Sequence, residues 1–361
     1  MHRRSVQRRE PAVRSVARAC HAGRRATMGD AGADRRMEDG TKTTEHAKPA
    51  RRLPRRRPLH KRIRDSLARG LVASMLGVAR IAPIALTVRL GEWLAVVLSR
   101  FDRRHRAVAF RNLERAFGSE LDAAARRRIV DGVYRHFGRL LAEYALLLAK
   151  PALLPASQRI QLEGVAAAQA AVRSHGAIII VTLHQGHWEL LGGAISEQVA
   201  KLHAVVLPLR DPVLNERLVD LRQRLGMGLI ERENAVAALF RCLRRGLSVG
   251  LLCDLDQEES PAFIEFFGTP AATVRTPAVL ALRTGKPLVL TGSWSTARPL
   301  DYHGVLMPPL FPDLAADPAV EEHRLLTAMN RQYEAFIRAH PEQWNWIHPR
   351  WETRPAGEPN R

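Results

Sequence analysis

The fold is decided by the stretch Ala177-Ile178-Ile179-Ile180-Val181-Thr182-Leu183-His184-Gln185-Gly186-His187-Trp188-Glu189. Its first part, residues 177–183, is an apolar run of the length of one buried strand. Gly186 then permits a tight turn, and the apolar residues after Glu189 predict a helix. His184 is therefore expected at the carboxyl end of a strand, which is where ligands usually bind in an open α/β sheet.

A histidine precedes this turn and a carboxylate follows it, and the two side chains together indicate acid–base chemistry. A carboxylate that holds one ring nitrogen of a histidine fixes its tautomer and stabilises the imidazolium, so that the other nitrogen is a good general base. The pair His184 and Glu189 therefore suggests that a hydroxyl is deprotonated for attack on a carbonyl. The alternative is that His184 is a satisfied core histidine, and its place beside Gly186 at a strand end argues against this.

Strand and helix patterns alternate from Ile160 onward, which predicts an α/β layer architecture, whereas residues 65–150 have a helical pattern. Strands are expected at residues 177–183, 204–209, 248–253, 263–266, 287–294 and 304–307, and helices at 165–174, 188–200, 212–225, 235–245, 274–284 and 321–339.

The spacing of His184 and Glu189 resembles the HxxxxE motif of the glycerolipid acyltransferase superfamily, and in detail that of the lipid A late acyltransferases, the lauroyl and myristoyl transferases of Gram-negative inner membranes. A lone motif of this kind arises by chance, but an ordered series accompanies it over roughly residues 106–355. That series comprises Arg111-Asn112-Leu113, Phe137-Gly138-Arg139 with Glu143, Pro208-Leu209-Arg210-Asp211-Pro212, Asp256-Gln257, Phe266-Phe267-Gly268-Thr269-Pro270-Ala271, Pro341-Glu342-Gln343-Trp344, His348 and Arg350-Trp351.

The resemblance implies a central mixed sheet flanked by helices, with membrane-associating helices on its N-terminal side. It also implies that the chain moves a fatty acyl group from an acyl carrier protein thioester, or from acyl-CoA, to a hydroxyl of a lipid A precursor or a related glycolipid. His184 would take the proton of that hydroxyl and Glu189 would orient the ring. No acyl-enzyme, cofactor or metal is implied.

Further residues are implied to bind substrate at the ends of neighbouring strands. Arg210 follows a predicted strand, and its guanidinium suits a phosphate or an oxyanion. Asp256 and Gln257 form the family dipeptide, and we prefer Asp256 to Asp254 for positioning Arg210 or the acceptor. The remaining implied residues are Phe266, Phe267, Gly268 and Thr273, where the two aromatic rings either line an acyl groove or belong to the core.

His187 forms a His-x-x-His pair with His184, which raises the alternative of a zinc-dependent hydrolase. The spacing is neither HExxH nor HxxEH, and catalytic zinc also needs a third protein ligand and an open position. We therefore predict that His187 caps the following helix or lines the pocket.

The formal net charge of +20 is uneven, because residues 1–60 hold 17 Lys and Arg against 6 Asp and Glu, a net +11. We expect a disordered basic leader at 1–60, a membrane-associating helical segment at 61–105, the acyltransferase domain at 106–355 and a tail at 356–361. Arginines interrupt the apolar stretch 66–98, which favours an interfacial helix pair over a clean spanning helix; they are Arg69, Arg80 and Arg89.

The basic excess fits an anionic membrane surface better than nucleic acid, because no zinc-finger, RNP-like or recognition-helix pattern accompanies it. Three scattered cysteines indicate a reducing, cytoplasmic side. This fits the inner membrane that the resemblance implies, with the catalytic domain facing the cytoplasm. Three alternatives remain: an acyltransferase acting on another glycolipid or a lysophospholipid, a zinc-dependent hydrolase built on His184 and His187, and a non-catalytic basic membrane- or nucleic-acid-binding protein.

Two smaller expectations concern residues outside the main motif. Arg222 is interpreted as a solvated helix charge. The tryptophans near the C-terminus either pack in the core or lie at a membrane interface; they are Trp344, Trp346 and Trp351.

Overall fold

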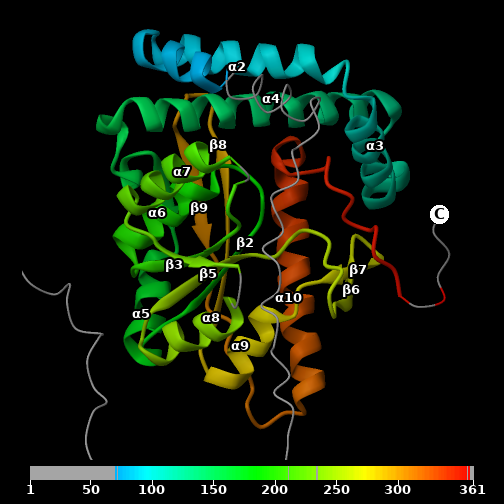
Figure 1. Cartoon of the computed structure of the whole chain (residues 1–361). Coiled ribbons are helices and arrows are strands. Elements are labelled where there is room, and N and C mark those ends of the chain that lie inside the picture. The colour runs from blue at the N-terminus through cyan, green and yellow to red at the C-terminus, as the bar shows by residue number, and fades with distance from the viewer. Residues whose placement is uncertain (1–69, 71, 210, 233–234, 356, 358–361) are drawn as a thin grey trace, which may run out of the picture. The chain divides into compact units, whose positions relative to one another are not determined.

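The central sheet has seven strands in the order β1-β9-β8-β2-β5-β3-β4 (Figure 1). The computed structural model describes residues 70, 72–209, 211–232, 235–355 and 357. The strands are β1 (Ile160–Glu163), β2 (Ile179–Thr182), β3 (Leu202–Val206), β4 (Gly228–Glu231), β5 (Ser248–Leu252), β8 (Leu288–Ser295) and β9 (Tyr302–Leu306).

The sheet is mixed, because β8 and β9 pair antiparallel and every other neighbouring pair is parallel. This confirms the predicted α/β class with a central mixed sheet. A separate antiparallel hairpin is formed by β6 (Ala262–Phe266) and β7 (Thr269–Thr273), and it lies beside α10 (Pro318–Ala339) (Figure 1).

Helices cover both faces of the sheet, which is why all four residues of β2 are buried. Ile179 and Val181 point into one core with α8, α9 and α10, while Ile178 and Ile180 point into a second core with α5, α6 and α7. The α-helices are α2 (Ile84–Ser99), α3 (Arg103–Phe117), α4 (Ala123–Ala149), α5 (Val165–His175), α6 (Trp188–Gln198), α7 (Pro212–Arg224), α8 (Ala235–Arg244), α9 (Thr276–Thr284) and α10.

The N-terminal helices pack on α4, along which α2 runs (Figure 1). Two glycines allow the close approach, since a Cβ added to Gly138 would lie 2.3 Å from the carbonyl oxygen of Gly91. The other side of α2 leaves three apolar side chains exposed: Leu86, Leu90 and Trp93. None of the described helices is long and apolar enough to cross a membrane.

The described part of the segment 61–105 is thus helical, as predicted, and its membrane association stays a prediction. The leader expected at 1–60 lies outside the described residues. The expected strands and helices are confirmed with small shifts, but the prediction missed β1, β4 and β7.

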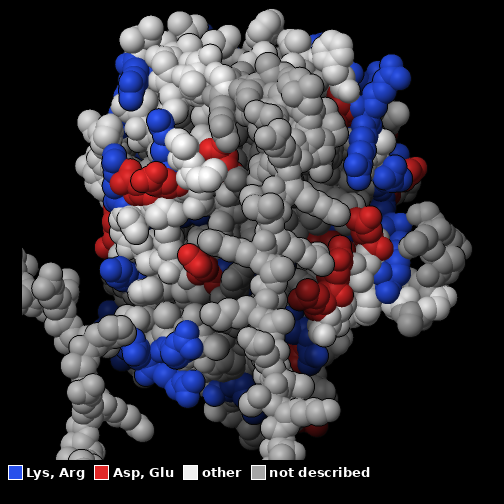
Figure 2. Space-filling view, in the orientation of Figure 1, with Lys and Arg blue, Asp and Glu red and all other residues white. Residues whose placement is uncertain are grey.

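Basic side chains gather over α8 and α9, toward the bottom of the view in Figure 2. These helices end just before β5 and β8 begin, so this cluster lies at the amino edge of the sheet. His184 follows β2 and therefore lies at the opposite edge.

Candidate active site

His184 leaves the carboxyl end of β2, and Asp254 leaves the carboxyl end of the adjacent strand β5. The Nδ1 atom of His184 lies 2.8 Å from Oδ1 of Asp254, and the His184 amide donates to Oδ2 at 2.8 Å. A carboxylate only accepts hydrogen bonds, so Nδ1 carries the proton and Nε2 is left with a free lone pair. This arrangement is that of a general base whose tautomer is fixed by a carboxylate.

Asp254 is buried and is held by a third donor, the indole Nε1 of Trp344, at 2.8 Å. Burial raises the pKa of this carboxyl, but the charge of His184 and the three hydrogen bonds outweigh it, so the pKa of Asp254 lies below its usual value. Burial likewise lowers the pKa of His184, and Asp254 outweighs that effect, so the pKa of His184 lies above its usual value.

Glu189 does not hold the ring of His184, so the prediction that it orients the base is wrong in this structure. Its carboxylate instead binds Arg222 of α7, whose Nε and Nη2 atoms lie 2.9 Å and 2.6 Å from Oε1. The side chain of Glu189 is 5% exposed and that of Arg222 is 14% exposed. Arg222 is therefore not the solvated helix charge that the sequence suggested. Asp254 takes the place expected for Glu189, because the pairing of β2 with β5 brings Asp254 to within 2.8 Å of Nδ1 of His184.

A cavity of about 990 Å³ opens over the carboxyl edge of the sheet. His184, Glu189 and Arg222 line it, and most of the remaining wall is apolar. That wall includes side chains from the helical residues 72–81 and from α4, α6, β3 and α8, such as Met75, Leu141, Leu191, Val205 and Val236. An apolar cavity with a few convergent polar groups is typical of a site for a ligand with a long hydrocarbon part.

The other predicted site residues divide into two groups. Asp256 and Gln257 line the cavity, as expected for residues near substrate. Arg210 lies outside the described residues. The remaining four do not line this cavity and belong to the β6–β7 hairpin or its turn, so their contact with substrate stays a prediction; they are Phe266, Phe267, Gly268 and Thr273.

The hairpin instead belongs to an aromatic core. Phe266 packs against Trp344 and Trp351, and Phe267 packs against Trp346. All three tryptophans are buried, which confirms that they pack in the core. Within this core Trp344 also fixes Asp254, so the aromatic packing supports the site indirectly.

His187 caps helix α6, as predicted, because its Nδ1 accepts a hydrogen bond from the amide of Leu190 at 3.4 Å. Its ring is fully buried and its pKa is lowered to about 3, first by burial and then by the charges of His136 and Arg139. A catalytic zinc site needs three protein ligands, and the described residues contain no group of three or more His, Cys, Asp or Glu side chains that could hold a metal ion.

The turn between His184 and α6 is tight, because Gly186 has a φ of +61°. A Cβ at this position would lie 2.2 Å from the carbonyl oxygen of Ser293 in β8. Only glycine therefore fits where the loop crosses the neighbouring strand.

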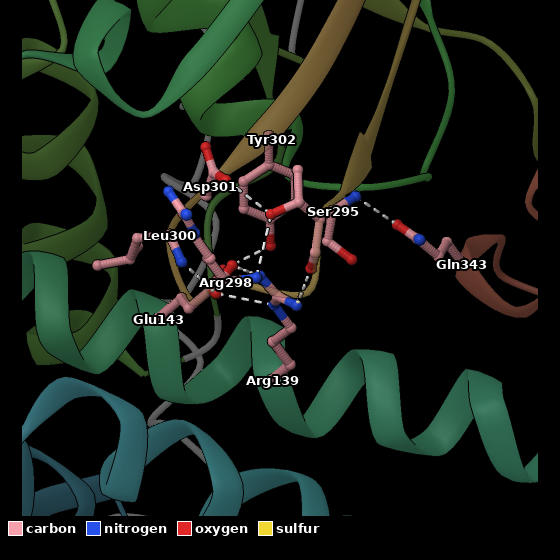
Figure 3. Close-up of polar contacts among 9 residues, drawn as sticks. Arg139, Glu143, Ser295, Arg298, Leu300, Asp301, Tyr302 and Gln343 are labelled. Atoms are coloured by element: carbon pink, nitrogen blue, oxygen red, sulfur yellow. Dashed lines mark hydrogen bonds and ion pairs between the residues drawn. The ribbon is translucent and has the colours of Figure 1, made fainter.

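A buried ion pair supports this edge of the sheet from α4. Arg139 donates to Glu143 at 2.9 Å and to the carbonyl oxygen of Thr296 at 2.7 Å, and Glu143 accepts from the hydroxyl of Tyr302 at 2.5 Å (Figure 3). The loop between β8 and β9 is thereby tied to α4. In the same view Ser295, at the end of β8, donates its amide hydrogen to Gln343 at 2.8 Å.

The chain is similar in sequence to bacterial acyltransferases. The family model described as bacterial lipid A biosynthesis acyltransferase matches residues 59–353. A lipid A biosynthesis palmitoleoyltransferase of Escherichia coli is 25% identical over 76% of this chain and 88% of its own length. The lauroyltransferase of the same organism is 27% identical over 77% and 89%. A phosphatidylinositol mannoside acyltransferase of Mycobacterium tuberculosis is 26% identical over 49% and 54%.

Proposed function

The chain belongs to the bacterial lipid A biosynthesis acyltransferase family, and from this premise we propose that it moves a fatty acyl group from an acyl carrier protein thioester to a hydroxyl of a lipid A precursor. It is an acyltransferase, as its relatives are named. The observation that carries the proposal is the His184–Asp254 pair, whose free Nε2 faces an apolar cavity large enough for a hydrocarbon chain.

In the proposed reaction, Nε2 of His184 takes the proton of the acceptor hydroxyl while Asp254 stabilises the imidazolium that forms. The hydroxyl oxygen attacks the thioester carbonyl, a tetrahedral intermediate forms, and the carbon–sulfur bond breaks to release the carrier thiolate. The imidazolium then gives its proton to this thiolate, so that the carrier leaves as a thiol and the protein is unchanged. No covalent acyl-enzyme is required.

We assign the pair Glu189–Arg222 a supporting task in the cavity wall. The guanidinium compensates the buried carboxylate, and this keeps the first turn of α6 in place beside His184. The charge of Glu189 also contributes to the raised pKa of His184, after that of Asp254.

The proposal includes attachment to the inner face of the cytoplasmic membrane. The exposed face of α2 supports it, since Leu86, Leu90 and Trp93 recur at helical spacing and nearby Arg80 and Arg89 are exposed. Apolar side chains of this kind enter the boundary between headgroups and acyl chains, while arginines reach the headgroups.

Phosphatidylinositol mannoside is a second candidate acceptor, because the mycobacterial relative is named as an acyltransferase of this lipid. Purified full-length protein would be incubated with lauroyl-acyl carrier protein, or with lauroyl-CoA, and either a lipid A precursor or a phosphatidylinositol mannoside. Mass spectrometry of the lipids then identifies donor and acceptor. We expect transfer by the wild type and none by His184→Ala, with His323→Ala, an exposed histidine of α10, as the control. Full activity of His184→Ala would contradict the proposal.

A further inference from the structure

Residues 343–353 cross the carboxyl edge of the sheet, and we call them the C-terminal strap. Near its start, Trp344 donates to Asp254. At its end, Thr353 donates through its amide (3.2 Å) and its hydroxyl (2.7 Å) to Asp256. The two aspartates that follow β5 therefore hold both ends of the strap.

His348 lies between these two anchors, and it lines the same cavity as His184. Its carbonyl oxygen accepts from the side chain of Asn112 at 2.7 Å and from the amide of Arg350 at 2.9 Å. These contacts fix the backbone from which the ring projects, so the position of the ring in the cavity is determined by the fold.

The ring nitrogens of His348 make no hydrogen bond within the described part of the chain. Its Nδ1 is buried without a hydrogen-bond partner among the described residues, and the same holds for Oδ1 of Asp256, which also lines the cavity. The Nε2 atom is not among these buried atoms, so it is the ring nitrogen that a ligand in the cavity can reach.

The electrostatic surroundings keep His348 neutral near pH 7. Burial lowers its pKa, the charges of Asp254 and Asp256 raise it, and His184 and Arg350 lower it further, so the pKa lies below its usual value. The reachable Nε2 of an uncharged ring forms a neutral hydrogen bond, which suits an uncharged oxygen group better than a phosphate.

We propose that His348 binds an uncharged oxygen group of the glycolipid acceptor, a second hydroxyl or an acyl carbonyl, and thereby turns the reacting hydroxyl toward His184. The inference rests on the proposed function, because it presumes that His184 is the base. Loss of one neutral hydrogen bond should weaken acceptor binding about tenfold.

The test compares two substitutions of similar size in the full-length protein. The amide nitrogen of His348→Gln reaches the place of Nε2, whereas the shorter side chain of His348→Asn leaves that place empty. With lauroyl-acyl carrier protein and a lipid A precursor, we expect His348→Asn to raise the acceptor KM about tenfold and His348→Gln to stay within about threefold of wild type. The matched control is His323→Gln on the exposed side of α10.

A second measurement separates positioning from structural support. Hydrolysis of the donor thioester without acceptor needs His184 and the donor but no acceptor contact, so its rate should be unchanged in His348→Asn. A wild-type acceptor KM in His348→Asn overturns the inference, and so does a parallel loss of thioester hydrolysis and thermal stability. If the wild type transfers no acyl group, the proposed function fails; if His184→Ala transfers acyl groups normally, the assignment of His184 as the base fails. If only the His348 variants behave as wild type, the inference alone fails.

Discussion

His184 and Asp254 lie 70 residues apart in the sequence, and this is also the offset between the strands that carry them. In the register of β2 and β5, Ile179 lies opposite Val249, and 249 − 179 = 70. The two side chains are therefore neighbours in the continuation of a parallel strand pair, two residues beyond the last paired residues, Thr182 and Leu252. The sheet itself sets the distance between base and carboxylate.

The first prediction concerns this carboxylate. Asp254→Asn keeps the shape but removes the charge that raises the pKa of His184. The base works in its neutral form, so kcat/KM falls as pH decreases through the pKa of His184, and in Asp254→Asn this decline should move to lower pH. The rate on the plateau should drop by a factor on the order of 100 to 10,000. Rates measured from pH 5 to pH 9 test both effects, and an unshifted decline would argue against the pair.

The second prediction concerns the buried ion pair of Glu189 and Arg222. Glu189→Gln leaves the guanidinium without its partner charge, and we expect the free energy of unfolding to fall by about 3 to 5 kcal/mol. The control is Asp220→Asn, which breaks the half-exposed pair with Arg224 on the same helix and should cost less than about 1 kcal/mol. Urea unfolding measures both, and equal losses would show that burial does not distinguish the pairs.

The third prediction is a loss of stability in acid. The pKa of His136 is lowered to about 4 and that of His187 to about 3, from an ordinary value of 6.5, and burial is the largest cause in both. Below pH 6.5 the unfolded chain binds protons at these rings and the folded chain does not, so stability falls as pH decreases toward 4. Each ring contributes about 1.4 kcal/mol per pH unit in this window.

A matched variant isolates this effect from the other titrating groups. His136→Gln removes one of the two rings, so its unfolding free energy should depend less steeply on pH between 6 and 4.5 than that of the wild type. Urea unfolding at several pH values gives both slopes. Identical slopes would mean that His136 does not stay neutral in the folded protein.

The fourth prediction tests the packing of α2 on α4. Gly138→Ala places a methyl group against the backbone of Gly91, and we expect it to destabilise the protein by about 1 to 3 kcal/mol. Gly77 is a helical glycine with no atom near its missing Cβ, so Gly77→Ala should have no cost and can add up to about 1 kcal/mol. Thermal unfolding of the two variants provides the comparison, and a tolerated Gly138→Ala would mean that α2 shifts freely.

The sequence predicted the sheet and the position of His184 because both depend on local patterns. An apolar run, a glycine and a helix start are contiguous, and they suffice to place a histidine at a strand end. The missed strands β1, β4 and β7 are short, and β7 begins with Thr269 and Pro270, which carry little strand signal. β1 and β4 depend on pairing with strands elsewhere in the chain, β9 and β3, whereas β7 pairs with β6 across a tight turn.

The partner of His184 could not be read from local spacing. Glu189 is close to His184 in sequence, but it belongs to the first turn of α6, and its carboxylate binds Arg222 of the neighbouring helix α7. Asp254 directly follows the apolar strand that ends at Leu252, and this was the available signal. Recognising it requires knowing that β5 is the neighbour of β2, which is a property of the sheet order.

The C-terminal strap has a consequence for biosynthesis. Trp344 supplies one of the donors to Asp254, and the ribosome adds it after every strand of the sheet has been made. A nascent chain that has not yet extended past this tryptophan lacks that donor, and the wall of the cavity that His348 completes is missing. Chemical competence therefore comes late in translation, when the acyl-binding surfaces have already been synthesised.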